Sequence, residues 1–309
     1  MEDLRKALDA ALPDVRVLTV GRRVEGYAND RWTVESDVGR LLVKVRRIPE
    51  EDPRQVEGQL RAQRWLSEIG FPTPELLCVV WKCPQLGGRQ LSVQRHVDAV
   101  DETGEVLEAT PADRRAAYFE GLGRAVGMLH SFELPEFGGW LDDTGTRHDT
   151  WAEAIHPGDA LRSVSAHPSV VPPDALAEAE RRIENGLSAL PDIRPRLVHR
   201  DLHVDNTLLG PGGGFGAIID FEMVREWDFP YDFSCRLDGV LDFFAGSKEP
   251  FMGAYREVAG ELPESFALRN WLYTGIYQIL AIEEFIGGNE GYARIPQALL
   301  AWLDKRAPV

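Results

Sequence analysis

The chain has 309 residues, of which 50 are acidic and 34 are basic, so its formal charge is −16 at pH 7. This length fits two domains or one large two-lobed fold and allows a large hydrophobic core. Hydrophobic residues make up 44% of the chain and charged residues 27%, which is ordinary for a globular protein. The strong negative balance argues against nucleic acid or an anionic membrane surface as the main partner.

The sequence carries no pattern of export, membrane insertion or a disulfide framework. Its three cysteines are too few for such a framework, and no two of them have the C-x-x-C spacing of zinc or redox sites. Charged residues stand at the start, where a secretory signal needs an apolar stretch, and no apolar run approaches the ~20 residues of a membrane-spanning helix. We therefore expect a cytoplasmic monomer or homodimer with no membrane partner.

The negative charge is unevenly distributed along the chain. Residues 1–97 hold 16 basic and 14 acidic side chains, a balance of +2, whereas residues 98–309 hold 18 basic and 36 acidic side chains, a balance of −18. One interpretation is an ordinary acidic, solvated surface. The other is a division into two functional lobes, of which the second attracts cations.

The first third of the chain predicts a small, mostly antiparallel sheet with one inserted helix. Apolar residues at helical spacing predict helices over 1–12, ended by Pro13, and over 55–69, ended by Gly70. Short β-like runs bounded by glycine, proline and turn residues predict strands over 15–20, 31–36, 40–46, 76–81 and 90–97.

After a hinge at 97–100 the pattern becomes mainly helical. Helices are predicted over 112–131 and 175–190, and most of 231–303 is expected to be helical. Short strands are predicted over 197–199, 207–209 and 217–219. Residues 132–173 are rich in glycine, proline and tryptophan, and we interpret them as a substrate-facing insertion or a flexible loop.

One segment carries the chemistry. Residues 199–206 read H-R-D-L-H-V-D-N, and Asp220 follows Asn206 after fourteen residues, at the end of an apolar strand. Phosphoryl transfer from a nucleotide needs a group that accepts the hydroxyl proton and hard oxygen ligands that hold Mg²⁺ against the triphosphate. The segment matches the kinase catalytic loop, H-R-D-x-x-x-x-N, at every specified position. His199 and His203 also have the spacing of a zinc pair, but Asn206 and Asp220 fit Mg²⁺ better.

These motifs resemble the aminoglycoside phosphotransferase family of small-molecule kinases, which is similar to choline and fructosamine kinases. The family's loop reads H-G-D-L-H-x-x-N, and residues 228–232, D-F-P-Y-D, resemble its D-P-x-Y-D motif. Residues 122–130 resemble the family's helix ending in L-H, and no A-P-E segment of protein kinases follows Asp220. The likeness covers about residues 20–240. It implies an α+β, protein-kinase-like bilobal fold, with a β-rich nucleotide-binding lobe over 1–97 and a mostly α-helical catalytic and substrate-binding lobe over 98–309.

The resemblance assigns roles by matching position. It implies that Asp201 is the catalytic base, that Asn206 and Asp220 bind Mg²⁺, and that Lys44 contacts the α- and β-phosphates of ATP or GTP. Two further residues are implied to be structural, namely His199, which anchors the catalytic loop, and Asp232, which braces it. Arg200 stands where the family usually has glycine.

The remaining nucleotide contacts are less regular. Gly26 and Asn29 belong to the turn at the place of the nucleotide loop, which is no G-x-G-x-x-G, and we place His96 and Val97 beside the nucleotide as well. The acidic partner of Lys44 is expected on the helix over 55–69, where Gln59 holds the matching position. Glu57 lies two residues earlier, about 200° around the helix, so either Gln59 supplies a neutral hydrogen bond or the register is shifted and Glu57 pairs with Lys44.

The predicted reaction is transfer of the γ-phosphate of MgATP or MgGTP to a hydroxyl of a small molecule. The acidic second lobe favours a cationic acceptor such as an aminoglycoside, and hence a role in antibiotic resistance. Candidate carboxylates for binding such a cation are Asp238, Asp242, Glu283 and Glu284. The alternatives are another acceptor, such as choline, an amino sugar or a macrolide, and a non-catalytic pseudokinase that only binds its partners.

Overall fold

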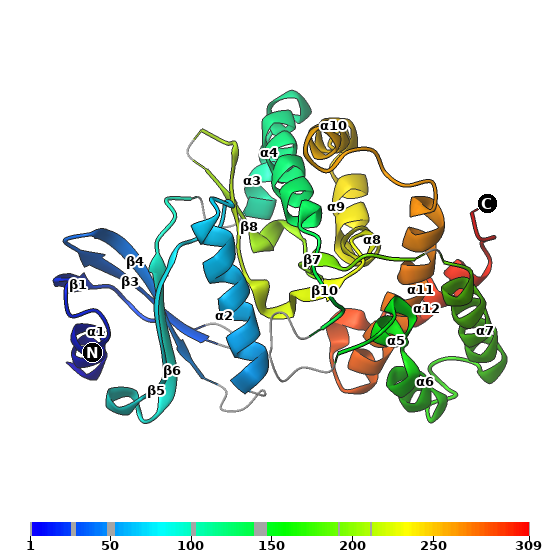
Figure 1. Ribbon diagram of the computed structural model, residues 1–309, viewed down its shortest axis with the longest axis horizontal. Helices are drawn as coiled ribbons and strands as arrows, with labels where there is room; N and C mark the ends of the chain where they lie inside the picture. Colours follow the sequence, from blue (N-terminus) through cyan, green and yellow to red (C-terminus); the bar gives the residue numbers. More distant parts are fainter. Residues whose placement is uncertain are drawn as a thin grey trace. The chain divides into compact units, whose positions relative to one another are not determined.

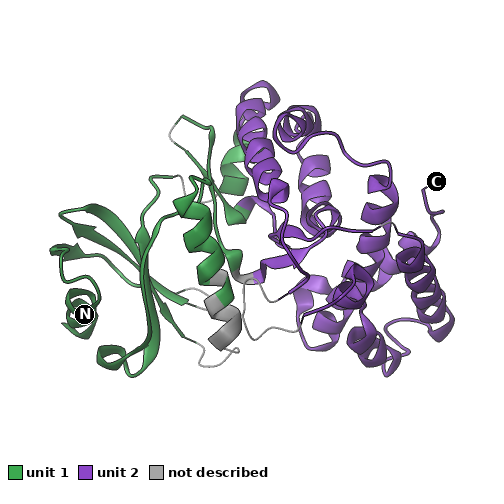
Figure 2. Ribbon diagram, viewed as in Figure 1, with its two compact units in different colours: residues 1–109, 205–222 green, residues 110–204, 223–309 purple. Residues whose placement is uncertain are grey.

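A computed structural model describes residues 2–25, 29–47, 53–99, 103–138, 147–190, 192–210 and 212–308 (Figure 1). The chain forms two compact units, Met1–Ala109 with Asp205–Glu222, and Thr110–Val204 with Met223–Val309 (Figure 2). The first unit is built on a β-sheet and the second is mostly helical, as predicted. None of the helices in the described ranges is long and apolar enough to cross a membrane.

The first unit extends beyond the boundary predicted at residue 97. Helix α3 (Thr103–Ala109) and a later hairpin belong to it, because Thr103 Oγ1 donates a hydrogen bond of 2.9 Å to the carbonyl oxygen of Thr207 in that hairpin. The division of the chain at residue 97 into a nucleotide-binding lobe and a catalytic and substrate-binding lobe stays a prediction.

A six-stranded antiparallel sheet forms the centre of the first unit. Its order is β1-β3-β4-β6-β5, with β2 paired to β3. The strands are β1 (Val17–Val20), β2 (Val24–Glu25), β3 (Asn29–Ser36), β4 (Gly39–Arg46), β5 (Leu76–Cys83) and β6 (Arg89–Arg95). Two helices complete this part, α1 (Glu2–Ala11) and α2 (Pro53–Glu68).

The two faces of strand β4 differ in chemistry. Leu41, Val43 and Val45 are fully buried and pack in one cluster with the apolar residues of α1. Successive side chains of a strand point to opposite faces, so Lys44 and Arg46 lie together on the other face, where they are half-buried. The core therefore lies on one side of the sheet and the cationic side chains of β4 on the other.

A short hairpin carries two of the predicted metal ligands. Strand β8 (Thr207–Leu209) pairs antiparallel with β9 (Phe215–Ile218), and the N–H of Ile219 donates a hydrogen bond of 2.9 Å to the carbonyl oxygen of Asn206. Ile218 N–H also donates to Pro72 O at 2.9 Å, which ties the hairpin to the segment before β5. This register places Asn206 beside the residue that precedes Asp220.

The second unit consists mainly of helices. Its long helices are α4 (Ala112–Ser131), α7 (Pro173–Ala189), α10 (Lys248–Ala259), α11 (Phe266–Ile286) and α12 (Ile295–Leu303). Shorter elements are α5 (Trp151–Ile155), α6 (Gly158–Ser165), α8 (Pro230–Asp232), a π-helical segment (Phe233–Leu237), α9 (Asp238–Phe243), the 3₁₀ turn Glu290–Tyr292, and the antiparallel pair β7 (Arg196–Val198) and β10 (Arg225–Trp227). Helix α10 packs along α4, where a Cβ on Gly127 would lie 2.9 Å from Tyr255 O, so glycine permits the close approach.

The interpretation of residues 132–173 as a flexible loop is wrong for its second half, while the alternative of a substrate-facing insertion stays a prediction. Helices α5 and α6 occupy most of it, and Trp151, Ile155 and Val164 are buried in the main core of the unit. A capping box between Thr150 and Glu153 starts α5, since each side chain accepts a hydrogen bond from the backbone of the other residue. Residues 139–146 lie outside the described part.

Candidate active site

A small cavity in the first unit lies on the polar face of the sheet. Its volume is about 40 Å³, and strands β3, β4 and β6, helix α2 and the segment after β9 line it. The lining residues are Asn29, Lys44, Arg46, Leu60, Gln63, Gln90, Ser92, Gln94, Asp220 and Phe221. The structure thus brings Lys44, Asn29 and Asp220, three of the predicted residues, to one cavity.

Two cations and one carboxylate provide the charge of this lining. Lys44 and Arg46 project from the same face of β4, and Asp220 lies exposed after β9. The uncharged part includes Gln63, whose Nε2 donates hydrogen bonds to Gln94 Oε1 at 3.1 Å and to Pro74 O at 3.0 Å. The sequence interpretation missed Arg46, although its position two residues after Lys44 in a strand places it on the same face.

Asp220 adopts a left-handed backbone conformation with φ of +64°. A non-glycine residue adopts this conformation at a cost, and such residues are frequent at active sites. Asn206, which is 8% exposed, lies at the neighbouring end of the hairpin. Their carboxylate and amide oxygens are ligands of the kind that Mg²⁺ prefers.

Asp220 and Asn206 have the chemistry of Mg²⁺ ligands. No group of three or more histidine, cysteine or acidic side chains is placed to hold a metal within the part of the chain that the structure describes. Mg²⁺ usually keeps several waters and binds one or two carboxylates plus substrate phosphates, which fits Asp220 and Asn206.

Asp232 organises the loop that begins at His199 in the second unit. This fully buried carboxylate accepts hydrogen bonds from the backbone N–H groups of His199 at 2.9 Å and Arg200 at 2.5 Å, and from His130 Nε2 at 2.9 Å. His130 is in turn 3.2 Å from the hydroxyl of Tyr255 through its other ring nitrogen. Three hydrogen bonds converge on one buried carboxylate, so the start of the loop is firmly held.

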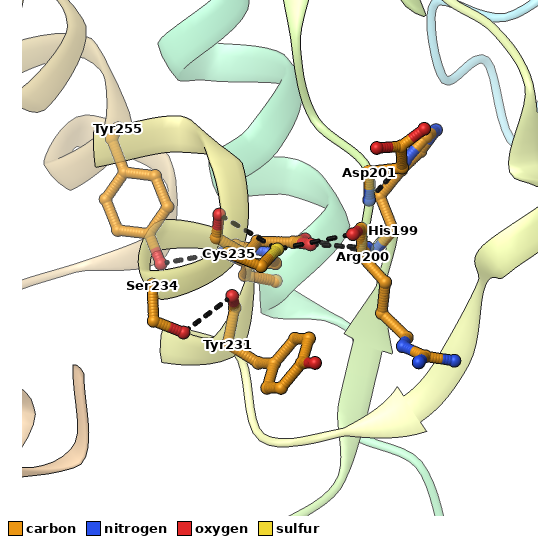
Figure 3. A network of polar contacts seen from close by, with 9 residues as sticks. His199, Arg200, Asp201, Tyr231, Ser234, Cys235 and Tyr255 are labelled. Atoms are coloured by element: carbon orange, nitrogen blue, oxygen red, sulfur yellow. Dashed lines mark hydrogen bonds and ion pairs between the residues drawn. The ribbon is translucent and has the colours of Figure 1, made fainter. Parts of the chain in front are cut away.

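Arg200 has an unusual backbone conformation for a residue that carries a side chain. Its φ is +70°, in the region that glycine adopts most easily. Its guanidinium lies 4.0 Å from the centre of the Trp227 ring, a cation–π contact, and points away from Asp201 (Figure 3). The Cys235 thiol donates a hydrogen bond of 3.2 Å to Arg200 O. Aromatic stacking on one side and hydrogen bonds on the other therefore hold a residue in a costly conformation.

Asp201 presents a half-buried carboxylate with a partner on each oxygen. Arg236 Nε lies 3.1 Å from Oδ1 and His203 Nε2 lies 3.4 Å from Oδ2. Burial by itself raises the pKa of Asp201, but the hydrogen bond from His203 and the positive charges of His203 and Arg236 outweigh it and lower the pKa to about 2. The Asp201 carboxylate is therefore ionised at neutral pH.

Several predicted nucleotide contacts have no described geometry at the cavity. Gly26 lies outside the described residues, and so do the side chains of Glu57 and Gln59. Pairing of Lys44 with Gln59 or with Glu57 therefore stays a prediction. The backbone N–H of His96 donates to Arg40 O at 3.0 Å, and its ring is 3.7 Å from Asp98. Neither His96 nor Val97 lines the cavity described above, and their nucleotide contacts stay predictions.

The four carboxylates predicted to bind an acceptor are spread over two helices, α9 and α11. Asp238 is half-buried and accepts a hydrogen bond of 2.6 Å from Asn270 Nδ2, while burial raises its pKa. Asp242 and Glu284 are exposed, and Glu283 is half-buried. Three cavities of about 400, 410 and 630 Å³ in this unit are lined by other residues. Acceptor binding by these four carboxylates stays a prediction.

Comparison with known proteins identifies related sequences and folds. The sequence model described as the phosphotransferase enzyme family matches residues 19–269. No curated protein matches the sequence. A putative aminoglycoside phosphotransferase from Ralstonia eutropha is similar in structure, with a TM-score of 0.71, 13% identity and 99% coverage of each chain.

Two further solved structures share the fold. A thermostable variant of aminoglycoside phosphotransferase APH(4)-Ia, in a ternary complex with ADP and hygromycin B, gives a TM-score of 0.69 at 16% identity and covers 95% of this chain and 96% of its own. A macrolide 2'-phosphotransferase type I gives a TM-score of 0.63 at 18% identity, covering 97% of this chain and 96% of its own. These likenesses support the protein-kinase-like fold predicted from the motifs.

Proposed function

The chain belongs to the phosphotransferase enzyme family, and we propose that it moves the γ-phosphate of MgATP or MgGTP to a hydroxyl group of a small cationic molecule such as an aminoglycoside. The observation that carries this proposal is the single cavity lined by both Lys44 and Asp220. A lysine for nucleotide phosphates and an oxygen ligand for Mg²⁺ are the two parts that phosphoryl transfer needs next to each other.

The first unit supplies the groups for the nucleotide. Lys44 and Arg46 offer positive charge to the phosphates from one face of β4, and Asn29 lies beside them in the cavity lining. Asn206 and Asp220 would hold Mg²⁺, which supplies charge neutralisation at the phosphate oxygens. Fixed positive groups stabilise the charge that develops on the transferred phosphoryl group.

The second unit supplies the group for the acceptor. Asp201 is ionised because its pKa is about 2, so its carboxylate accepts a hydrogen bond from the acceptor hydroxyl and orients that oxygen toward the phosphorus atom. As the new O–P bond forms and the bond to the nucleoside diphosphate breaks, the hydroxyl proton passes to Asp201. The transition state is loose, and positioning of this kind supplies much of the rate enhancement.

The charge distribution supports a cationic acceptor. Residues 98–309 carry a balance of −18, and an acidic field raises the local concentration of a cation and speeds its association. The macrolide phosphotransferase that shares the fold keeps a second acceptor class open. Choline and amino sugars are further alternatives.

An ADP-release screen tests the proposal. Purified protein is assayed with ATP and with GTP against aminoglycosides, macrolides, choline and amino sugars, with Asp201→Asn as the inactive control. We expect turnover with a polycationic acceptor and a KM for it that rises with ionic strength. A KM that is independent of salt would contradict the cationic class, and a nucleotide-dependent rise in Tm with no turnover on any acceptor would favour a pseudokinase.

A further inference from the structure

The side chain of Arg236 contacts the carboxylate of Asp201, the predicted catalytic base. It belongs to the π-helical segment Phe233–Leu237, and its Nε lies 3.1 Å from Asp201 Oδ1. π-Helical turns are rare and are frequently found at functional sites. No motif of the sequence indicates this contact, because 35 residues separate the two partners.

Other side chains hold the Arg236 guanidinium from the side away from Asp201. Arg236 Nη2 donates a hydrogen bond of 3.2 Å to the Tyr292 hydroxyl, and the guanidinium carbon lies 5.8 Å from the ring centre of Tyr277 and 5.9 Å from that of Tyr292. The Arg236 side chain is 34% exposed and that of Asp201 is 29% exposed. Pairs buried to this degree are screened less by water and salt than surface pairs, and the planar guanidinium fixes the direction of its hydrogen bonds.

Three residues on one side of the helix that runs from α8 into the π-helical segment contact three successive residues of the catalytic loop. Asp232 accepts from the backbone of His199 and Arg200, Cys235 donates to Arg200 O, and Arg236 contacts the Asp201 side chain. Residues at i, i+3 and i+4 share one face of a helix. Asp232 and Cys235 fix the main chain of the loop, and Arg236 is the member of this set that acts on the carboxylate itself.

We propose that Arg236, held by Tyr292, is a positioning residue that fixes the orientation of the Asp201 carboxylate toward the acceptor hydroxyl. This inference rests on the function proposed above. Further groups around Asp201 include His203 on the second carboxylate oxygen and His199, whose Nδ1 accepts a hydrogen bond of 3.3 Å from the Asp201 N–H. Tyr277 on α11 lies beside Arg236, and burial together with the negative charge of Asp201 raises the pKa of its hydroxyl.

Substitution of Arg236 tests the proposal with two readouts. For Arg236→Gln we expect kcat to fall about 10–100-fold while KM for the nucleotide stays within about two-fold, because misplacement of a catalytic group by about 1 Å costs up to a hundred-fold. The pKa of Asp201, followed by the ¹³C signal of its carboxyl carbon and assigned with Asp201→Asn, is expected to rise. Arg236→Lys keeps the charge and is expected to restore the pKa more fully than kcat. Tyr292→Phe is expected to lower kcat less than Arg236→Gln.

Arg182→Gln is the matched control. Arg182 is in the same unit, its side chain is 25% exposed, and its Nε lies 2.6 Å from Glu178. Its loss is expected to leave both kcat and the Asp201 pKa unchanged. An Arg236→Gln protein that keeps wild-type kcat, or that loses kcat with an unchanged Asp201 pKa, would overturn the proposal.

Failure of the reaction proposed above has a different signature. In that case wild-type protein releases no ADP with any acceptor, and the carboxyl titration decides the inference without turnover. An Asp201 pKa that rises in Arg236→Gln and not in Arg182→Gln would then support control of the carboxylate by Arg236. An Asp201 pKa that is equal in both variants would refute it.

Discussion

The carboxylate of Asp232 accepts a 2.5 Å hydrogen bond from the backbone N–H of Arg200, a residue whose φ is +70°. A non-glycine residue in this conformation costs of order 1–3 kcal/mol and persists only where its surroundings impose it. Arg200 lies directly before Asp201 in the chain, so the contact that stabilises its unusual backbone also sets where the side chain of Asp201, the predicted catalytic base, begins.

Asp232→Asn is expected to destabilise the fold and to reduce activity together. The amide keeps one acceptor oxygen but brings an NH₂ group against donors that now face the second carboxylate oxygen. Each buried donor left unsatisfied costs about 1–3 kcal/mol, and the free energy of unfolding in urea measures the sum. Asp174→Asn, at an exposed position at the start of α7, is the control and is expected to change the unfolding free energy little.

Two substitutions of Arg200 separate backbone strain from ring stacking. Both Arg200→Ala and Arg200→Gly lose the contact with Trp227, but only glycine adopts the left-handed conformation without a Cβ clash. We expect the glycine variant to be more stable than the alanine variant by about 1–2 kcal/mol. Equal unfolding free energies for the two variants would show that the strain at this position is negligible.

Regular elements and local motifs were the predictable part of this protein. Helix α4 begins and ends at the predicted residues 112 and 131, and strand β8 was predicted over the residues it occupies, since period and turn signals are properties of adjacent residues. The loop over 199–206 was likewise readable as a contiguous motif. The short helix α5 was missed although its capping box, Thr150 with Glu153, is present in the sequence.

Contacts between distant segments were not predictable from the pattern. Arg236 contacts Asp201, which is 35 positions earlier in the chain, and Arg46 and Asp220 line the same cavity. The periodicity of the sequence predicts neither contact. The positive φ values at Arg200 and Asp220 are also invisible, because neither residue is a glycine. The family resemblance predicts a role for Asp201, whereas the side chains around its carboxylate are seen only in the structure.

Lys44→Ala is expected to weaken nucleotide binding selectively. Lys44 lines the cavity that holds Asp220, and its ammonium is the point charge that phosphate groups attract. Isothermal titration is expected to show about a ten-fold or greater loss of ATP affinity, since a charge-assisted hydrogen bond contributes about 1.5–3 kcal/mol. Lys82→Ala, at an exposed position in β5, is the matched control. Equal ATP affinity in both variants would remove Lys44 from the nucleotide site.

Protonation of Asp201 is not expected to reduce the kcat of the wild-type protein at any pH above 4. The pKa of Asp201 is lowered from 3.8 to about 2, so the carboxylate stays ionised as pH falls from 7 to 4. A carboxyl group whose pKa is lower in the folded state adds stability above its unfolded pKa, and this contribution is lost as pH falls from about 4 toward 2. The urea unfolding free energy of wild-type protein is therefore expected to fall over that range, with a smaller fall in Asp201→Asn, which has no such proton to bind. A kcat limb between pH 5 and 7 that tracks the carboxyl signal of Asp201 would contradict the lowered pKa.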